Sequence, residues 1–159
     1  MNTYTINGYD LTLEKVSAIL ADPDSCVSVA DEAKVKCRKT RNQIDRWLSK
    51  DAPVIYGINT GLGALKDVVV PPEKHVEWNK HLPYPHSAGF GNYLPAQVTR
   101  LALLLRANIL CRAYSAPRVE LIERMLSLVN ADIAPAAFAE GSTGLSDLAP
   151  LAQCAMAVA

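Results

Sequence analysis

The sequence has little of what marks a secreted, membrane or metal-binding protein. No run approaches the ~20 consecutive apolar residues that a membrane-spanning helix needs. The amino-terminal stretch lacks the basic-then-apolar pattern of a secretory signal. The four cysteines are far apart and form no Cys-x-x-Cys pair, which argues against zinc and against a disulfide framework. We therefore expect a reduced, cytoplasmic protein without a metal site.

Net charge is also absent. The 159 residues include 16 basic and 16 acidic side chains, so the formal charge is zero. A neutral chain gives no electrostatic case for binding nucleic acid or an anionic membrane surface. Half of the residues are apolar, and no internal repeat or linker divides the chain. Residues 1–159 are therefore expected to form a single unit with a packed core.

Apolar side chains recur at helical spacing along most of the chain. A short helix is expected after Asp10 or Thr12, either of which can cap it, and a longer one from near Ser28. The stretch from Pro95 to about Tyr114 is apolar almost all round, which is typical of a helix buried between other helices. Further helices are expected around Trp78, after Ser115 and Pro117, and from near Asp147. The helix after Pro117 carries apolar residues at helical spacing: Val119, Ile122, Met125, Leu126 and Val129.

These patterns predict an all-α fold class, a bundle of long helices with one minor strand at residues 54–56. The last helical pattern, residues 148–159, stops without the glycine, proline or basic turn that usually closes a helix. Its apolar surface and unpaired carbonyls need a cover. We therefore expect that a second polypeptide, or a C-terminal region of the same one, completes the core.

Three glycine-rich segments each hold a reactive side chain. Glycine permits positive φ and close approach of the backbone to a ligand, and loops held by rigid helices are where sites usually form. No Gly-Lys-Ser/Thr is present, and the strand and helix context of a dinucleotide-binding loop is missing. The segments are 56–63 (YGINTGLG), 86–91 (HSAGFG) and 141–151 (GSTGLSDLAPL).

Each reactive residue also has an ordinary structural interpretation. Tyr56 is either a base, which requires a site that favours phenolate, or a buried tyrosine bonded to a carbonyl. Asn59 is either a partner for a carboxylate or a turn residue. His86 is either a proton carrier or a structural histidine in a turn. Residues 142–146 lie before a helix, where the positive end suits an electrophile or an anion, or simply marks a capped start.

In this order and at these separations, the three segments resemble those of histidine and phenylalanine ammonia-lyases. Those enzymes carry Tyr-Gly-x-Asn-Thr-Gly-Phe-Gly, then Ser-His-x-x-Gly-x-Gly, then Gly-Ser-x-Gly-Ala-Ser-Gly-Asp-Leu-Ala-Pro-Leu. The likeness covers essentially the whole chain, including residues 105–115, where Ala113 stands in place of the family's glycine. It implies the N-terminal third of a mostly helical ammonia-lyase-like fold.

The resemblance implies roles for particular residues. Tyr56 matches the family's catalytic tyrosine, which removes a β-proton from the substrate. His86 matches a histidine implicated in substrate binding and proton handling. Ser146 matches the serine of the tripeptide Ala-Ser-Gly, which in the family cyclises to methylidene-imidazolone (MIO), an electrophile that captures the substrate. The substrate-binding loop is matched by Asn59, Gly61, Leu62 and Gly63, with Leu62 in place of the usual phenylalanine.

The chain departs from the family at this tripeptide. Between Gly144 and Asp147 it has two residues, Leu145 and Ser146, where the family has three. Ring closure needs the amide nitrogen after the serine to attack the carbonyl before it, and here that nitrogen belongs to Asp147, which lacks glycine's freedom. We therefore predict that MIO is absent or atypical. Pro85, in place of the usual serine, also stiffens the approach to the histidine.

Three functional hypotheses remain open on the sequence. The first is a subunit or fragment of an ammonia-lyase-like enzyme that acts on an aromatic amino acid or a related small molecule through Tyr56 and His86. Its reaction would be an elimination, an isomerisation or another proton transfer. The alternative is a non-catalytic scaffold or partner subunit of the same fold, and the third is a standard ammonia-lyase with a processed tripeptide. Because the family's remaining site residues come from later segments and from other subunits, activity requires a homo- or hetero-oligomer with further polypeptide.

Overall fold

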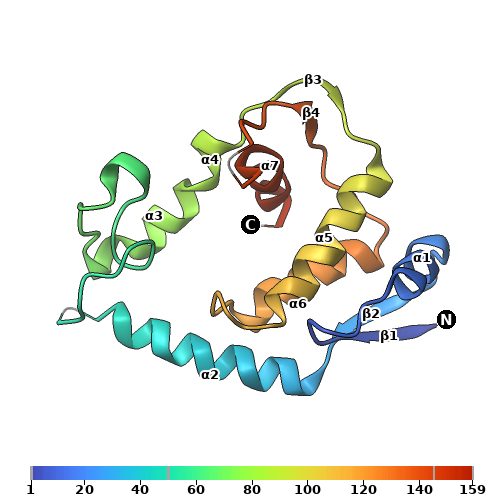
Figure 1. Ribbon diagram of the computed structural model, residues 1–159, viewed down its shortest axis with the longest axis horizontal. Coiled ribbons are helices and arrows are strands. Elements are labelled where there is room, and N and C mark those ends of the chain that lie inside the picture. Colours follow the sequence, from blue (N-terminus) through green and yellow to red (C-terminus); the bar gives the residue numbers. More distant parts are fainter. Residues whose placement is uncertain (1, 50, 145, 159) are drawn as a thin grey trace.

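The structure, a computed structural model, describes residues 2–49, 51–144 and 146–158. Helices dominate it, which confirms the mainly α fold class (Figure 1). In chain order the elements are β1 (Thr3–Ile6), α1 (Leu13–Ala21), β2 (Cys26–Val29), α2 (Asp31–Trp47), the 3₁₀ helices η1 (Gly63–Leu65) and η2 (Pro72–Lys74), α3 (His75–His81), α4 (Pro83–His86), β3 (Phe90–Tyr93), α5 (Ala96–Leu110), α6 (Val119–Asn130), β4 (Phe138–Glu140) and α7 (Leu148–Val158).

The first two helices differ in how well their starts were predicted. α1 begins as expected, because the hydroxyl of Thr12 accepts a hydrogen bond from the Lys15 N–H at 3.3 Å. α2 begins at Asp31, three residues later than expected, because Ser28 lies in β2. Ala33 and Cys37 are its buried residues, whereas Ile44 and Trp47, which share their helical spacing, are only partly buried.

The strands are the part of the fold that the sequence patterns missed. β1 and β2 pair in parallel, with Thr3 opposite Cys26 and Ile6 opposite Val29, and α1 forms the crossover between them. β3 and β4 pair antiparallel. The strand predicted at residues 54–56 is wrong: Val54 and Tyr56 are 64% and 62% exposed, in irregular chain and a turn. An apolar run forms a strand only where a second strand accepts its hydrogen bonds.

The core lies where α5 and α6 pack against each other and against the β1–α1–β2 unit. α6 begins at Val119 rather than after Ser115, because Ala113 and Ala116 take positive φ values of 64° and 50° and extend the turn. The buried face of α6 is nonetheless the predicted one. It consists of Val119, Ile122, Met125, Leu126 and Val129.

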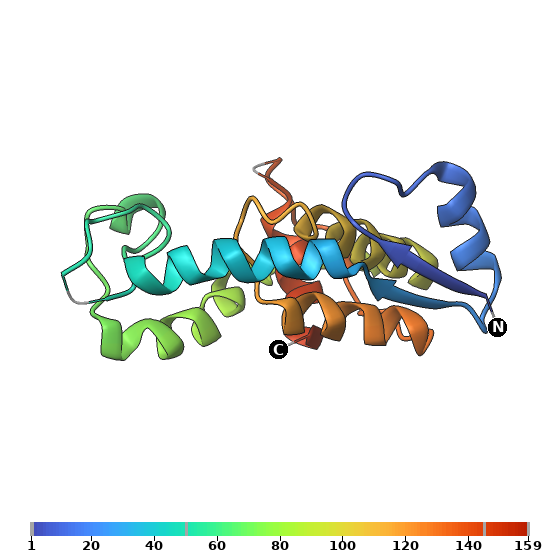
Figure 2. The same ribbon diagram turned by 90° about the horizontal axis from the view of Figure 1, so that it is seen from below.

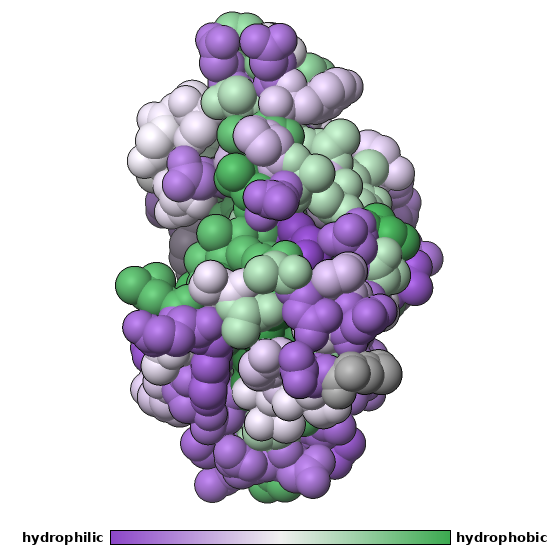
Figure 3. All heavy atoms as spheres, turned by 90° about the vertical axis from the view of Figure 1, so that its right-hand side faces the viewer, coloured by the Kyte–Doolittle hydropathy of each residue, from purple (hydrophilic) through white to green (hydrophobic). Residues whose placement is uncertain are grey.

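The helices are arranged around a central space, with α2 along one edge, α3 and α4 at one end and α5 and α6 facing them (Figure 1). Seen edge-on, α2 crosses in front of the other helices and the molecule is flattened (Figure 2). Its narrow end beside β1 and α1 mixes hydrophobic and hydrophilic residues (Figure 3). Among the described residues, no helix is both long enough and apolar enough to cross a membrane.

Candidate functional site

The loop after α2 holds Tyr56 and is built around the side chain of Asn59, which is only 6% exposed. The Asn59 amide oxygen accepts a hydrogen bond from the Ile55 N–H at 2.7 Å. Its amide nitrogen donates to the carbonyls of Pro53 and Trp47 at 2.9 and 3.2 Å. All of these partners are backbone groups, so Asn59 fixes the loop to the end of α2. We call residues 53–63 the tyrosine loop.

Tyr56 itself points away from the packed core. Its phenol oxygen accepts a hydrogen bond from the Gly63 N–H at 3.4 Å, while most of the ring is exposed. Gly61 cannot carry a side chain, because a Cβ there would come within 2.6 Å of the Leu65 Cβ. Leu62 precedes η1 and is partly exposed. The loop therefore presents the Tyr56 hydroxyl on a constrained backbone.

His86 ends the short helix α4 and is half-buried. Its Nδ1 lies 2.8 Å from the carbonyl oxygen of Leu82. A carbonyl can only accept, so Nδ1 carries the hydrogen, and Nε2 of the neutral ring is left as an acceptor. This arrangement suits a group that takes up a proton at Nε2.

Gln153 of α7 ties the segment after His86 to two other elements. Its amide nitrogen donates to the carbonyls of Ser87 and Ala88 at 3.2 and 3.1 Å, and its amide oxygen accepts from the Phe138 N–H at 2.7 Å. Sequence reasoning missed this residue. The only clue in the sequence is that Gln153 lies in the helix that begins within the third glycine-rich segment. The sequence does not indicate which carbonyls it binds.

The turn before α7 holds Ser146. The Asp147 carboxylate accepts a hydrogen bond from the Ser142 hydroxyl at 2.7 Å, and that hydroxyl accepts one from the Gly144 N–H at 3.2 Å. Ser146 and Asp147 both adopt left-handed backbone, with φ of 56° and 48°, and both are exposed. Leu145, the other residue of the altered tripeptide, lies outside the described residues.

Two of the three glycine-rich segments meet in the fold, and the third lies apart. A Cβ on Gly141 would come within 2.9 Å of the Gly89 Cα, so the histidine segment and the turn before α7 touch through two glycines. The tyrosine loop lies on the far side of α3 and α4 from that turn (Figure 1). Tyr56 is therefore separated from His86 and Ser146 within this chain.

A hollow lies at the centre of the molecule, lined by both the tyrosine loop and α7, and we call it the central basin. Its volume is about 960 Å³. Gly57 and Ile58 of the tyrosine loop line it on one side, and Leu151 and Cys154 of α7 on another. Burial raises the pKa of the Cys154 thiol, which keeps this cysteine protonated and a poor nucleophile.

The remaining titratable groups offer little chemistry. His75, to which no role was assigned, is buried, and its Nε2 lies 2.7 Å from the Val70 carbonyl oxygen. Cys26, Cys37, Cys111 and Cys154 are all free thiols. Among the residues described by the structure, no group of three or more His, Cys, Asp or Glu side chains could hold a metal ion.

Comparison with known proteins identifies relatives along almost the whole chain. Residues 11–159 match the family model described as aromatic amino acid lyase. The chain is 39% identical to a probable histidine ammonia-lyase from Thermoplasma volcanium, over 96% of this chain and 31% of that protein. The chain thus spans less than a third of that relative's length.

Solved structures agree with this match. An ergothioneine-degrading enzyme, ergothionase, from Treponema denticola superposes with a TM-score of 0.91 at 25% identity, over 98% of this chain and 31% of that one. Histidine ammonia-lyase from Trypanosoma cruzi superposes with a TM-score of 0.84 at 29% identity, over 97% and 29% of the two chains.

Proposed function

The chain belongs to the aromatic amino acid lyase family, and we propose that it forms part of an ammonia-lyase-like enzyme that works without a normal MIO group. The substrate is an aromatic amino acid or a related small molecule, and the reaction is an elimination driven by Tyr56 and His86. The assembly is an oligomer in which further polypeptide supplies the rest of the fold. Its four free thiols are in keeping with a reducing, cytoplasmic setting.

The observation that carries this proposal is the state of the Tyr56 hydroxyl. It is exposed, and its one hydrogen-bond partner in the described structure is the Gly63 N–H, which donates to it. The Gly63 N–H holds the phenol oxygen at the loop surface, where a substrate can reach it. Phenolate at Tyr56 then takes a proton from the substrate Cβ, the C–H electron pair becomes the Cα=Cβ bond, and the leaving group departs from Cα with its bonding pair.

His86 has the complementary part in this proposal. With Nδ1–H held by the Leu82 carbonyl, Nε2 is the nitrogen that can exchange a proton with the substrate or with Tyr56. Because the two residues lie apart within one chain, the site forms where the tyrosine loop of one subunit meets the histidine segment of another. Asn59, Gly61, Leu62 and Gly63 shape the wall against which the substrate lies, and Ser146 borders the same site.

The turn before α7 does not fit an MIO group. Ring formation would require the Asp147 nitrogen to fold back on the carbonyl before Ser146. Asp147, however, carries a side chain that is bonded to Ser142. Left-handed backbone at two consecutive non-glycine residues already costs about 1–2 kcal/mol each, which leaves no easy path to a tighter bend. We therefore route no step through MIO.

Loss of the electrophile changes which substrates can react. A primary amino group is a poor leaving group and needs activation, whereas a quaternary trimethylammonium group, as in ergothioneine, cannot be deprotonated and leaves as a neutral amine. Histidine and ergothioneine, the compounds named by the similar proteins, are therefore the substrates to compare first. Turnover of ergothioneine without turnover of histidine would support elimination that needs no electrophile.

The test uses the assembled protein, purified through a tag on this chain. Denatured mass spectrometry gives the mass of the chain, and ultraviolet absorbance follows formation of the conjugated alkene from each substrate. We expect an unmodified mass, and a fall in kcat of about 10²- to 10⁴-fold for Tyr56→Phe. Tyr114→Phe, at an exposed tyrosine outside the tyrosine loop, is the matched control and should retain full turnover.

Other outcomes select the other hypotheses. Unchanged turnover in Tyr56→Phe would remove the catalytic role and leave the scaffold subunit as the explanation. A mass short by two waters would mean that the ring forms despite Asp147, and deamination of histidine would then be the expected activity.

A further inference from the structure

The central basin carries charge of one sign. The cationic side chains that line it are Arg41, Lys80, Arg106 and Arg118, and no Asp or Glu is among its lining residues in the described part of the chain. Arg41 is neutralised by Asp45 at 2.8 Å. Within that same part, the other three cations have no carboxylate within 4.0 Å.

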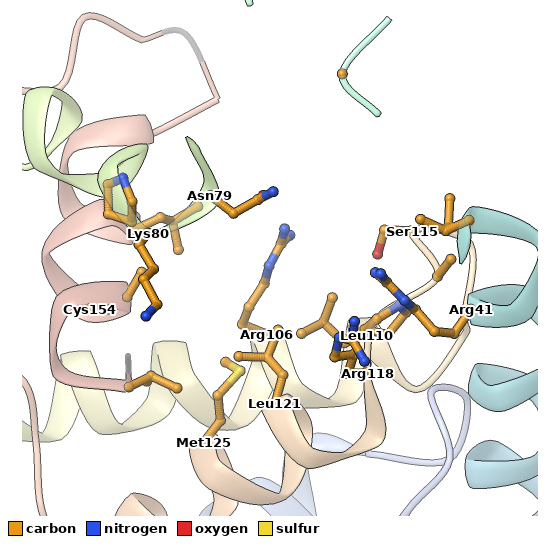
Figure 4. Close-up of a pocket in the computed structure, with 18 of the residues that line it drawn as sticks. Arg41, Asn79, Lys80, Arg106, Leu110, Ser115, Arg118, Leu121, Met125 and Cys154 are labelled. Carbon is orange, nitrogen blue, oxygen red and sulfur yellow. The ribbon is translucent and has the colours of Figure 1, made fainter. Parts of the chain in front are cut away.

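These cations surround an apolar floor. Leu121 and Met125 of α6 lie below Arg106, with Leu110 of α5, Arg118 and Arg41 on one side and Lys80 and Asn79 on the other (Figure 4). Leu121 remains 45% exposed, whereas Met125 and Leu110 are only 5% and 7% exposed. The basin therefore combines an exposed leucine with cations that have no carboxylate partner in the described part of the chain.

We propose that the central basin seats an acidic amphipathic helix of the polypeptide that carries the remainder of the lyase fold. Its apolar stripe lies on the exposed Leu121, and its carboxylates face Arg106, Arg118 and Lys80. An α-helix with its side chains is about 10 Å wide and places residues three or four apart on one face, so one helix can present both features. This inference rests on the proposed function only in requiring that further polypeptide.

Length and charge decide between the possible occupants. The chain spans 31% of the relative from Thermoplasma volcanium, so more than two thirds of such a protein is available to cover the basin. The chain's own α7, which lines the basin, carries no acidic residue and cannot neutralise it. Cations around the exposed Leu121 favour a partner whose carboxylates pair with them, because an unpaired charge in a buried interface is costly.

The experiment maps carboxylates that lie next to the basin in the assembled complex. Arg106→Lys and Arg118→Lys keep the positive charge and introduce an amine, which a carbodiimide couples directly to a neighbouring carboxylate. The complex is purified through a tag on this chain and cross-linked, and the linked peptides are sequenced. Arg124→Lys, on α6 outside the basin, is the matched control.

We expect positions 80, 106 and 118 to cross-link to Asp or Glu residues of one segment of the other polypeptide, spaced three or four apart. Position 124 should form no such link. Arg106→Glu together with Arg118→Glu should raise the dissociation constant of the complex at least tenfold, whereas Arg124→Glu should change it less than twofold.

Three results would overturn the inference. They are cross-links only within this chain, cross-links to a second copy of it as identified by isotope mixing, and unchanged affinity in the charge-reversed variant. The lysine variants retain the charge, so a folding defect in the glutamate variant does not remove the test. Cross-links in an inactive complex would sustain the basin's role while the proposed chemistry fails, and turnover without them would do the reverse.

Discussion

The β1–α1–β2 unit with α5 and α6 differs from the region that holds the candidate site in how far its own contacts satisfy its side chains. In the first region the Arg100 side chain, 5% exposed, donates to the carbonyls of Val129 and Leu20 at 3.1 and 3.3 Å, while its Nη2 has no hydrogen-bond partner among the described residues. In the second, Tyr56 is largely exposed and the central basin holds unpaired cations. The first region thus places its buried cation on backbone acceptors of the core, whereas the second leaves polar groups such as the Tyr56 hydroxyl exposed.

The largest predicted effect tests the region formed by β1–α1–β2, α5 and α6. Arg100→Met should lower the free energy of unfolding by about 3 kcal/mol, because two helix carbonyls lose a charged donor inside the core. Chemical denaturation of the variant measures this change. Asp132→Asn is the control: it removes the ion pair of Arg100 with the exposed Asp132 carboxylate at 3.3 Å and should cost less than about 1 kcal/mol. Equal losses would mean that the ion pair, and not the carbonyl contacts, is what matters.

The same region predicts a dependence of stability on pH. Burial, with a contribution from nearby Cys37, raises the pKa of Cys111 from 9.0 to about 12. A raised pKa means that the protonated thiol is favoured in the folded state. Its contribution is therefore complete below pH 9 and is lost as pH rises toward 12, by at most about 1.4 kcal/mol per pH unit. Denaturation at pH 8 to about 11 should show a shallower decline for Cys111→Ala than for the unchanged chain.

Substitution of Asn59 tests whether the tyrosine loop, in the region of the candidate site, depends on the hydrogen bonds of this side chain. Asn59→Ala removes three hydrogen bonds and should open the tyrosine loop at a local cost of about 2 kcal/mol. Amide exchange at Ile55 should then be about 30-fold faster, with little change in global unfolding. Asn42→Ala, on the exposed side of α2, should change neither. A rise in KM at unchanged exchange would instead indicate direct contact between Asn59 and substrate.

Helices were predictable from the sequence because their patterns are local. The apolar spacing of residues 119–129 gave the buried face of α6 correctly, and Thr12 gave the start of α1. β1 and β2 were missed because each has only four residues, and their pairing across α1 depends on contacts far apart in the chain. The run at 54–56 misled because apolar composition alone does not provide a partner strand.

The site residues were predictable only through the family's motifs. Those motifs marked Tyr56, His86 and Ser146, but no local pattern indicated that the tyrosine loop would lie apart from the other two segments. Gln153 was missed for the same reason, since its partners are backbone groups distant in the sequence, and the cations of the central basin come together only in the fold. Which residues of one segment face another is set by tertiary packing.

The smallest predicted effect concerns Ala113. Ala113 stands where the family resemblance places a glycine, and it has φ of 64° at the end of α5. Left-handed backbone costs alanine about 1–2 kcal/mol, whereas glycine adopts it freely. Ala113 is also buried, so removing its methyl group loses up to about 0.8 kcal/mol of burial free energy, which offsets part of the relief of backbone strain. Ala113→Gly should therefore raise the free energy of unfolding by about 0.5 kcal/mol. The matched variant Ala107→Gly, at a buried helical position, should lower it by about 1 kcal/mol or more. A loss of stability in both variants would mean that packing against the core outweighs backbone strain at this turn.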